Sequence, residues 1–293
     1  MTLRVLTYLA PSIPLGLFEL VVERLRRVLG VRATLRAEAR HSGPPPDIPD
    51  PFSADEADLA FLCSPSFAWL SGMRPSPIEL VPAAPVFLEP RTAGRPVYFS
   101  DVIVHPGVAS ASFEELRGRR WAYNDRCSLS GYFNLLARLR ALGEDRHFLR
   151  TARRSGSHLR SVELTARGEV DGAAVDSNVL ALLRRRDPLL CERVRVVASW
   201  GPYAVQPIVV RGGTAIARIL LAMAASRPSV PRSRRSASAA SRQRRGLPTK
   251  PTSPHSGATY TSLSCRSPKA VSSSAPRHPE RRRRPGVDPH DSP

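Results

Sequence analysis

A turn of the form Ser-x-Ser-Gly holds the residue types best suited to bind a small anion. It consists of Ser128, Leu129, Ser130 and Gly131. Residues 120–123 before it are predicted to form a short strand, and a helix is predicted from Gly131 to about Leu142. The first N–H groups of a helix have no partner within the helix, and the helix dipole adds positive potential there. Two hydroxyls and a glycine at this point predict a pocket for a tetrahedral oxyanion. The alternative is that Ser128 or Ser130 only caps the helix.

Five further segments accompany this turn in a defined order. They are residues 96–100, 112–118, 155–161, 168–177 and 201–207. The third is another turn that leads into a helix, and the fourth is a predicted buried strand that ends in a carboxylate. In this order the segments resemble the phosphate/phosphite/phosphonate-binding proteins of ABC transporters. The resemblance extends from about Leu3 to Arg211 and is densest between Tyr98 and Pro207.

The resemblance implies a bilobed type II periplasmic-binding-protein-like fold, with the ligand held between two α/β lobes. Ser128, Ser130 and the backbone N–H groups around Gly131, including that of Leu129, would bind the phosphoryl oxygens. Tyr98 and His158 would donate hydrogen bonds from neighbouring loops. Asp176 would select what else the ligand carries, such as an amine or a protonated oxyanion. Neutral donors bind an anion without a full countercharge, and a nearby carboxylate disfavours fully ionised species.

Each of these three additional residues also has a structural interpretation. His158 is suited to cap its helix or to satisfy a backbone carbonyl group. Asp176 is a candidate N-cap for the helix that begins at Ser177, which is compatible with a role in the ligand site. Tyr98 is a candidate packed aromatic residue of its strand.

Strand and helix signals alternate through the first 210 residues, which predicts an α/β fold with two mostly parallel sheets joined by crossover strands. The predicted strands are residues 3–9, 31–36, 58–63, 78–88, 97–104, 120–123, 148–153, 172–175 and 194–198. The predicted helices are residues 15–29, 65–70, 113–116, 131–142, 157–166 and 177–183, with one more within 212–225. We expect residues 1–92 to begin lobe 1, residues 93–199 to form lobe 2, and residues 200–225 to return to an incomplete lobe 1.

The positive charge of the chain is concentrated at its end. Of the net charge of +19, residues 226–293 carry 15 basic and 3 acidic groups, a net of +12, which leaves +7 for the first 225 residues. This serine-, proline- and arginine-rich segment is predicted to be disordered. It is either a basic arm or a terminus read in a shifted frame. We expect no nucleic-acid partner, because the charged segment lacks interleaved aromatic residues for stacking on bases.

The four cysteines indicate neither a metal site nor a redox motif. Cys63, Cys127, Cys191 and Cys265 lie far apart and form no CxxC pair, so buried free thiols are expected and a single disulfide stays open. No cofactor or metal is predicted. No apolar run is long enough to span a membrane, and no export signal is evident. The chain as written is therefore expected in the cytoplasm, or in the periplasm or outside the cell if its true start lies upstream and the family role holds.

The leading functional hypothesis is a solute-binding protein, not an enzyme, that captures phosphate, phosphonate or a related oxyanion for ABC-type transport. Its expected protein partner is the transporter permease, and its lobes would close about crossovers near residues 88–97 and 199–206. The alternative is a cytosolic enzyme or ligand sensor with the same fold, for which His158 and Asp176 are the candidate pair. A third hypothesis, binding of nucleic acid by the basic tail, requires an affinity that falls steeply with salt.

Overall fold

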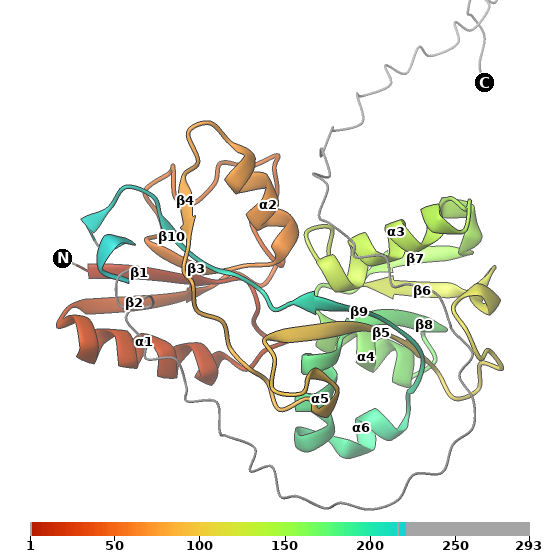
Figure 1. Cartoon of the computed structure of the whole chain (residues 1–293). Helices are drawn as coiled ribbons and strands as arrows, with labels where there is room; N and C mark the ends of the chain where they lie inside the picture. Colours follow the sequence, from red (N-terminus) through yellow and green to blue (C-terminus); the bar gives the residue numbers. More distant parts are fainter. Residues whose placement is uncertain (1, 216, 221–293) are drawn as a thin grey trace, which may run out of the picture. The chain divides into compact units, whose positions relative to one another are not determined.

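Two five-stranded sheets, each flanked by helices, form the part of the chain that the structure describes (Figure 1). The computed structural model describes residues 2–215 and 217–220, which all belong to one structural unit. We call each sheet with its helices a lobe. Lobe 1 contains β1 (Thr2–Thr7), α1 (Leu15–Leu29), β2 (Arg32–Ala37), β3 (Leu59–Phe61), α2 (Ser64–Gly72), β4 (Ile78–Leu80) and β10 (Ile208–Arg211). Lobe 2 contains β5 (Val97–Val104), β6 (Arg120–Tyr123), α3 (Asn134–Ala141), β7 (Thr151–Arg154), α4 (His158–Ala166), β8 (Gly172–Asp176), α5 (Ser177–Arg186), α6 (Pro188–Glu192) and β9 (Arg195–Ala204). Short helical turns are η1 (Pro90–Thr92), η2 (Glu114–Leu116), η3 (Leu129–Phe133) and η4 (Arg146–Phe148).

The two sheets share one strand order. It is β2-β1-β3-β10-β4 in lobe 1 and β7-β6-β8-β5-β9 in lobe 2. The first three strands of each sheet pair in parallel, whereas β10 and β5 pair antiparallel with the neighbours on both sides. Four strands of each sheet therefore run one way and one runs against them. The chain passes from the first sheet to the second at β5 and returns to the first sheet at β10, so these two strands are the crossover strands. The prediction of two mostly parallel sheets joined by crossover strands is therefore confirmed.

Helix α1 shows how local sequence sets these elements. Its apolar residues recur at helical spacing, and Phe18 and Val22 are buried against the sheet of lobe 1. The helix ends at Gly30, which has a φ of 64° and donates its N–H to the carbonyl of Arg26. Glycine adopts this left-handed conformation without a steric cost, so it terminates the helix at the predicted residue.

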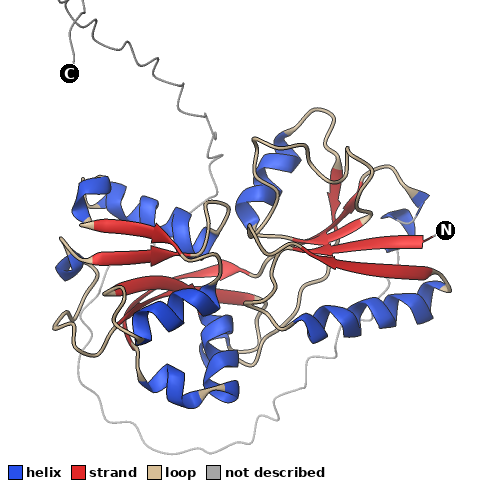
Figure 2. Cartoon of the chain, turned by 180° about the vertical axis from the view of Figure 1, so that it is seen from behind, coloured by secondary structure: helices blue, strands red, loops and turns tan. Residues whose placement is uncertain are grey.

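The core of lobe 2 follows the two-residue period of its strands. Val102 and Val104 of β5 face one side of the sheet, where they pack with Trp121 and the helix α3. Ile103 faces the other side, in a cluster that includes Val162 of α4. Both faces of the sheet are therefore covered by helices, as Figure 2 shows, and the sheet holds its strand ends in fixed positions.

Several elements differ in extent from the sequence-based expectation. Strand β4 stops at Leu80 rather than at residue 88, because prolines follow it and cannot donate to a ladder. Strand β7 begins at Thr151 rather than at residue 148, since Phe148 closes the turn η4. Strand β9 runs on to Ala204 by pairing with β5 through two register shifts. The short helix α6 was not predicted.

The end of the described chain returns to lobe 1. Residues 217–220 are helical, and Ala217 and Leu220 are buried in the same cluster as Phe18. The predicted disordered tail at residues 226–293 lies outside the described residues, and the predicted domain boundaries at residues 92 and 199 stay predictions. Within the described ranges no helix is both long and apolar enough to cross a membrane.

Arg91 joins the first segment that connects the lobes to the strands β5 and β9 of lobe 2. It lies in η1, on the first crossover, and its guanidinium binds both carboxylate oxygens of Asp101 at 3.0 and 2.7 Å. The same group donates to Glu89 at 2.8 Å and to Ser199 of β9 at 3.0 Å. Asp101 and Glu89 are buried, so their charges depend on this partner for compensation.

We predict that Arg91→Ala lowers the free energy of unfolding by about 1.5–3 kcal/mol, because it leaves two buried carboxylates without their charged donor. Arg91→Lys should lose less, since it keeps the charge but not the planar fork. Urea denaturation followed by circular dichroism measures the effect. The matched control is Arg150→Ala on the surface of lobe 2, and equal stability of the Arg91 and Arg150 variants would contradict the assignment.

Candidate functional site

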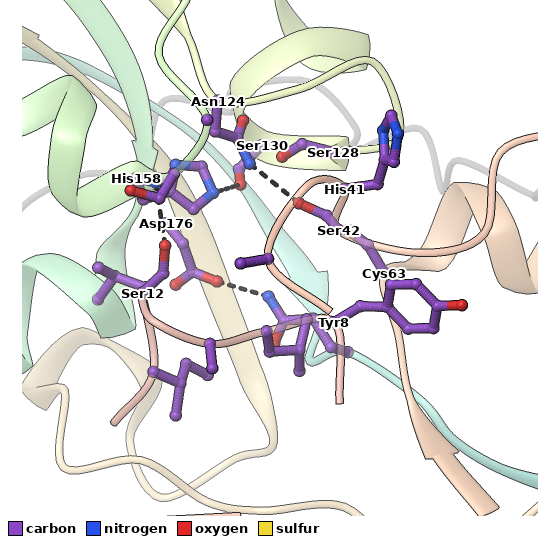
Figure 3. A pocket seen from close by; sticks show the side chains of 18 residues that line it. Tyr8, Ser12, His41, Ser42, Cys63, Asn124, Ser128, Ser130, His158 and Asp176 are labelled. Carbon is purple, nitrogen blue, oxygen red and sulfur yellow. Dashed lines mark hydrogen bonds between the residues drawn. The ribbon is translucent and has the colours of Figure 1, made fainter. Parts of the chain in front are cut away.

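A small cavity lies where strand ends of the two lobes meet (Figure 3). In lobe 2, β6 leads to Asn124, the adjacent parallel strand β8 ends at Asp176, and β7 leads to His158. In lobe 1, β1 and β3 lead to Tyr8 and Cys63. The carboxyl ends of parallel strands share one edge of a sheet, which explains why residues far apart in sequence line one cavity. Further polar lining residues are Ser12, His41, Ser42, Ser128, Ser130 and Gln206.

The Ser-x-Ser-Gly turn forms a π-helical turn, η3, at the start of α3. The carbonyl of Ser128 accepts the amide of Phe133, five residues on, at 3.1 Å. The Ser128 hydroxyl accepts the Gly131 amide at 3.1 Å, so the capping interpretation holds for this residue. The Leu129 amide donates to the Cys63 thiol of lobe 1 at 3.3 Å. No acceptor for the Ser130 amide is found among the described residues, which leaves that donor open at the helix start.

Ser130 and His158 form the polar centre of the cavity. The Ser130 hydroxyl lies 3.0 Å from Nε2 of His158, and both side chains are buried. The Nδ1 atom of His158 is buried and has no hydrogen-bond partner among the described residues. Burial lowers the pKa of His158 to about 4, so the ring is neutral near pH 7. A neutral imidazole and a hydroxyl can each donate to an anion without bringing a full charge.

Asp176 joins three parts of the structure. One carboxylate oxygen accepts the Asn178 amide at 2.7 Å and so caps α5, and the other accepts the Gln206 side-chain amide at 2.6 Å. The predicted N-cap role is therefore present together with a position on the cavity wall. Burial raises the pKa of Asp176 to about 6, above the usual range of an aspartate. The cavity thus holds one weakly acidic carboxyl group among neutral donors.

Gly131 permits a close contact with Asn124. A Cβ atom at residue 131 would lie 1.9 Å from Oδ1 of Asn124 and 3.3 Å from the ring of His158. The Asn124 side chain donates to Ser42 of lobe 1 and to Asp125, both at 3.0 Å, while its Oδ1 has no partner among the described residues. The glycine therefore gives Asn124 the space that it needs to reach across to lobe 1.

The cavity is small, and the basic residues that line it are two histidines, His41 and His158. Its volume is about 30 Å³, room for roughly two water molecules. Neither lysine nor arginine occurs among the residues that line it. A larger anion requires the lobes to move apart slightly or the lining side chains to shift.

Four of the predicted site residues come together at this cavity, and the other three lie at or behind its wall. Ser128, Ser130, His158 and Asp176 line it. Leu129 and Gly131 belong to the same turn through their backbone. Tyr98 is fully buried in β5 rather than exposed on a loop, and its hydroxyl has no well-formed hydrogen bond among the described residues. Burial raises the pKa of Tyr98 well above 10, with Cys63, Asp176 and Ser130 as polar neighbours.

The residues that sequence reasoning missed belong mainly to lobe 1. They are Tyr8, Ser12, His41, Ser42 and Cys63, together with Asn124 and Gln206. Asn124 directly follows β6, and Tyr8 and Cys63 stand one or two residues after β1 and β3. The rule that ligands bind beyond the carboxyl ends of strands could have found these three. Ser42 lies in a long loop without such a signal.

Comparison with protein families gives one match that covers most of the chain. The family model described as "ABC transporter, phosphonate, periplasmic substrate-binding protein" matches residues 17–244. No match was found among curated proteins. The matched range includes every predicted site residue and extends beyond the described part of the chain.

Solved structures with the same fold include proteins of this kind. A binding protein component of an ABC phosphonate transporter from Pseudomonas aeruginosa has a TM-score of 0.62 at 15% identity, covering 76% of this chain and 72% of that one. PhnD1 from Prochlorococcus marinus in complex with methylphosphonate has a TM-score of 0.60 at 16% identity, covering 75% and 82%. A Xanthomonas citri protein bound to chloride has a TM-score of 0.56 at 18% identity, covering 78% and 85%. At these identities the likeness establishes the fold.

We predict that Gly131→Ala lowers the free energy of unfolding by about 1–3 kcal/mol, because the added methyl group displaces Asn124 and breaks its contacts. Thermal and urea unfolding measure this effect. Gly72→Ala at the end of α2 is the matched control, since a Cβ atom there meets nothing within 4 Å. Equal free energies of unfolding for Gly131→Ala and Gly72→Ala would contradict the close contact between residues 131 and 124.

His158 and Asp176 make opposite contributions to the pH dependence of stability. The pKa of Asp176 rises from 3.8 to about 6 on folding, so the folded chain binds more protons and this contribution to stability is lost as pH rises through 6. The pKa of His158 falls from 6.5 to about 4, so its contribution is present above 6.5 and is lost as pH falls through 4. In the native protein the two effects offset each other between these values.

We predict that removing either Asp176 or His158 reveals the pH dependence of stability that the other group causes. In Asp176→Asn, stability should rise with pH between about 4 and 6.5, whereas in His158→Gln it should fall between about 4 and 6. Urea unfolding at a series of pH values gives both slopes, with the exposed Glu192→Gln as control. Unchanged slopes in both variants would mean that neither group titrates as assigned.

Proposed function

Because this chain belongs to the phosphonate-binding family of periplasmic substrate-binding proteins of ABC transporters, we propose that it captures phosphonate, phosphate or a related small oxyanion between its lobes. The observation that carries the proposal is the buried contact between Ser130 and the neutral His158 at a helix start, inside a cavity shared by both lobes. Donors of this kind are suited to the oxygens of a tetrahedral anion.

The proposed ligand contacts follow from the open donors of lobe 2. The hydroxyl and amide of Ser130 would donate to two phosphoryl oxygens. His158 would donate through one ring nitrogen once its bond to Ser130 is exchanged for the ligand. The Ser128 hydroxyl, which already accepts the Gly131 amide, retains its own proton for a further bond. The role of Tyr98 would be to hold Ser130 from behind rather than to bind the ligand.

Asp176 would select the protonation state or the substituent of the ligand. When ionised, its carboxylate repels a fully charged anion but accepts a hydrogen bond from the P–OH group of a singly protonated one, or pairs with an ammonium group on the ligand. When protonated, it donates to an anion oxygen. Its pKa of about 6 allows both forms near neutral pH.

Capture would proceed by closure of the lobes about the two crossovers. Strands β5 and β9 continue the connecting segments, and Arg91 joins the first of these segments to β9. Lobe 1 already meets lobe 2 through Ser12, whose hydroxyl accepts the His158 amide at 3.0 Å. A ligand that contacts both lobes would shift the population toward this closed arrangement.

The cavity contains part of the pattern that nucleophilic catalysis requires, but not all of it. Ser130 and His158 could act as nucleophile and base, yet Nδ1 of His158 has no group to orient it among the described residues. Asp176 is instead held by Asn178 and Gln206. The geometry therefore favours reversible binding over the enzymatic alternative.

Delivery to an ABC transporter permease would complete the proposed role. The family description names the periplasm as the location, and a role in uptake would put this protein there or at the cell surface. Loss of phosphonate-dependent growth on deletion of the gene, with growth restored by the native sequence, would support the transport role. Unaffected uptake in the deletion strain would contradict it.

We predict that Ser130→Ala weakens binding of the oxyanion by about 1–3 kcal/mol, because one hydrogen bond to a charged group is lost. Isothermal titration calorimetry with methylphosphonate, phosphite and phosphate measures the affinity. Ser110→Ala is the matched control, since this buried serine of lobe 2 bonds a backbone carbonyl outside the cavity.

The same titrations also test the proposed function itself. Binding of at least one of the three anions to the native protein, weakened in Ser130→Ala and unchanged in Ser110→Ala, supports the proposal. The absence of heat with all three anions, for protein shown to be folded by circular dichroism, would overturn it.

A further inference from the structure

Three side chains of metal-binding type meet at the edge of the cavity that is proposed to bind the oxyanion. One ligand atom each from His41, Asp125 and Cys127 lies within 4.8 Å of the others. No other group of three histidine, cysteine or acidic residues with this property occurs in residues 2–215 and 217–220. A tetrahedral zinc ion with nitrogen, oxygen and sulfur ligands needs such atoms about 2.0–2.3 Å from the metal. A small inward movement of the three side chains would satisfy that geometry.

The three residues come from different lobes. His41 follows β2 in lobe 1, next to Ser42, and both are labelled in Figure 3. Asp125 and Cys127 follow β6 in lobe 2. The lobes already touch at this point, because the Ser42 hydroxyl donates to the Asp125 carboxylate at 2.5 Å. A cation held here would therefore bind to both lobes at once.

Each side chain has coordination capacity left. Nδ1 of His41 is buried and has no hydrogen-bond partner among the described residues. Asp125 accepts bonds from Ser42, Asn124 and the Cys127 amide, which occupy three of the roughly four acceptor positions of its carboxylate. Cys127 is a buried free thiol. The unsatisfied imidazole nitrogen is the observation that points to a missing partner.

The surrounding charge favours a cation. The carboxylates of Asp125 and Asp47 lie close enough to the Cys127 thiol to place negative potential on it. The same negative potential that disfavours a bare thiolate attracts a divalent ion. Arg154 on the lobe 2 side opposes it in part. Ser66 of α2 lies beside the thiol.

We propose that His41, Asp125 and Cys127 form a three-ligand site for a zinc-like divalent cation that links the two lobes. Imidazole, carboxylate and thiolate suit zinc better than calcium or magnesium, which prefer oxygen ligands. Binding forms three coordination bonds, and the thiol proton passes to the solvent. One coordination position stays open for water.

The site has a functional consequence if the chain also binds an oxyanion as proposed. A cation that bridges the lobes stabilises the closed arrangement, and so does a ligand held in the adjacent cavity. By linkage each then raises the affinity for the other by the same factor. Only this coupling depends on the proposed function, because the cation site itself needs no oxyanion.

The test is calorimetric titration of the full-length protein with Zn²⁺ in phosphate-free buffer. We expect one stoichiometric binding event that weakens at least about tenfold in His41→Ala and in Cys127→Ser, since even loss of an outer-shell partner of a metal costs 10–100-fold. His147→Ala, an exposed histidine, and Cys191→Ser are the matched controls. Titration with Co²⁺ should give a thiolate-to-metal absorption band that Cys127→Ser removes. Cys265→Ser tests for binding by the terminal segment.

The outcomes separate this proposal from the proposed function. The metal site is overturned if the native protein, His41→Ala and Cys127→Ser all bind Zn²⁺ with equal affinity. It is also overturned if Cys265→Ser is the only variant that loses Zn²⁺ binding. If Cys127→Ser does not fold, His41→Ala alone decides, because this side chain is only partly buried. Zn²⁺ binding without methylphosphonate, phosphite or phosphate binding leaves the metal site standing and contradicts the oxyanion proposal. Oxyanion binding without Zn²⁺ binding does the reverse.

Discussion

The site depends most on the hydrogen bonds that the buried carboxyl group of Asp176 accepts. Asp176 terminates β8, caps α5 through the Asn178 amide, and holds Gln206, which stands between β9 and β10. One side chain therefore fixes a strand end, a helix start and a crossover relative to one another. Because the group is desolvated, its pKa rises, and this rise persists only while the donors around it are neutral. The absence of lysine and arginine from the lining residues is consistent with this constraint: a guanidinium beside Asp176 would ionise it and occupy it as a partner.

Much of the fold could be predicted from the sequence because its signals are local. The apolar spacing of α1 and the glycine after it predict both helix ends, and the apolar pattern of residues 97–104 predicts the bounds of β5. Prediction was weaker where pairing decides the extent of an element. Strand β9 reaches Ala204 only because β5 lies beside it, and every residue of β4 pairs with β10 from the end of the described chain. In these pairs the partner residues are more than 90 positions apart in the sequence. A local sequence pattern therefore does not predict the pairing.

The candidate site divides in the same way. Its lobe 2 half was predictable, since a serine-rich turn, a helix start and a strand-ending carboxylate each carry a recognisable pattern. Its lobe 1 half was predictable only in part: Tyr8 and Cys63 follow strand ends, whereas Ser12 and Ser42 are ordinary loop residues until the lobes meet. The cluster at His41 was missed for a related reason. The usual zinc spacing places two ligands a few residues apart, whereas His41 is separated from Asp125 and Cys127 by more than 80 residues and by a crossover.

The shared strand order has a further consequence for the biosynthesis of the protein. All five strands of lobe 2 occupy one continuous stretch, from β5 to β9. Lobe 1, in contrast, has β10 inserted between β3 and β4, although β10 is the last strand in the described part of the chain. During translation, lobe 2 can complete its sheet first. The nascent lobe 1 must meanwhile leave a gap in its sheet, with the unpaired edges of β3 and β4 exposed, until residue 211 has left the ribosome.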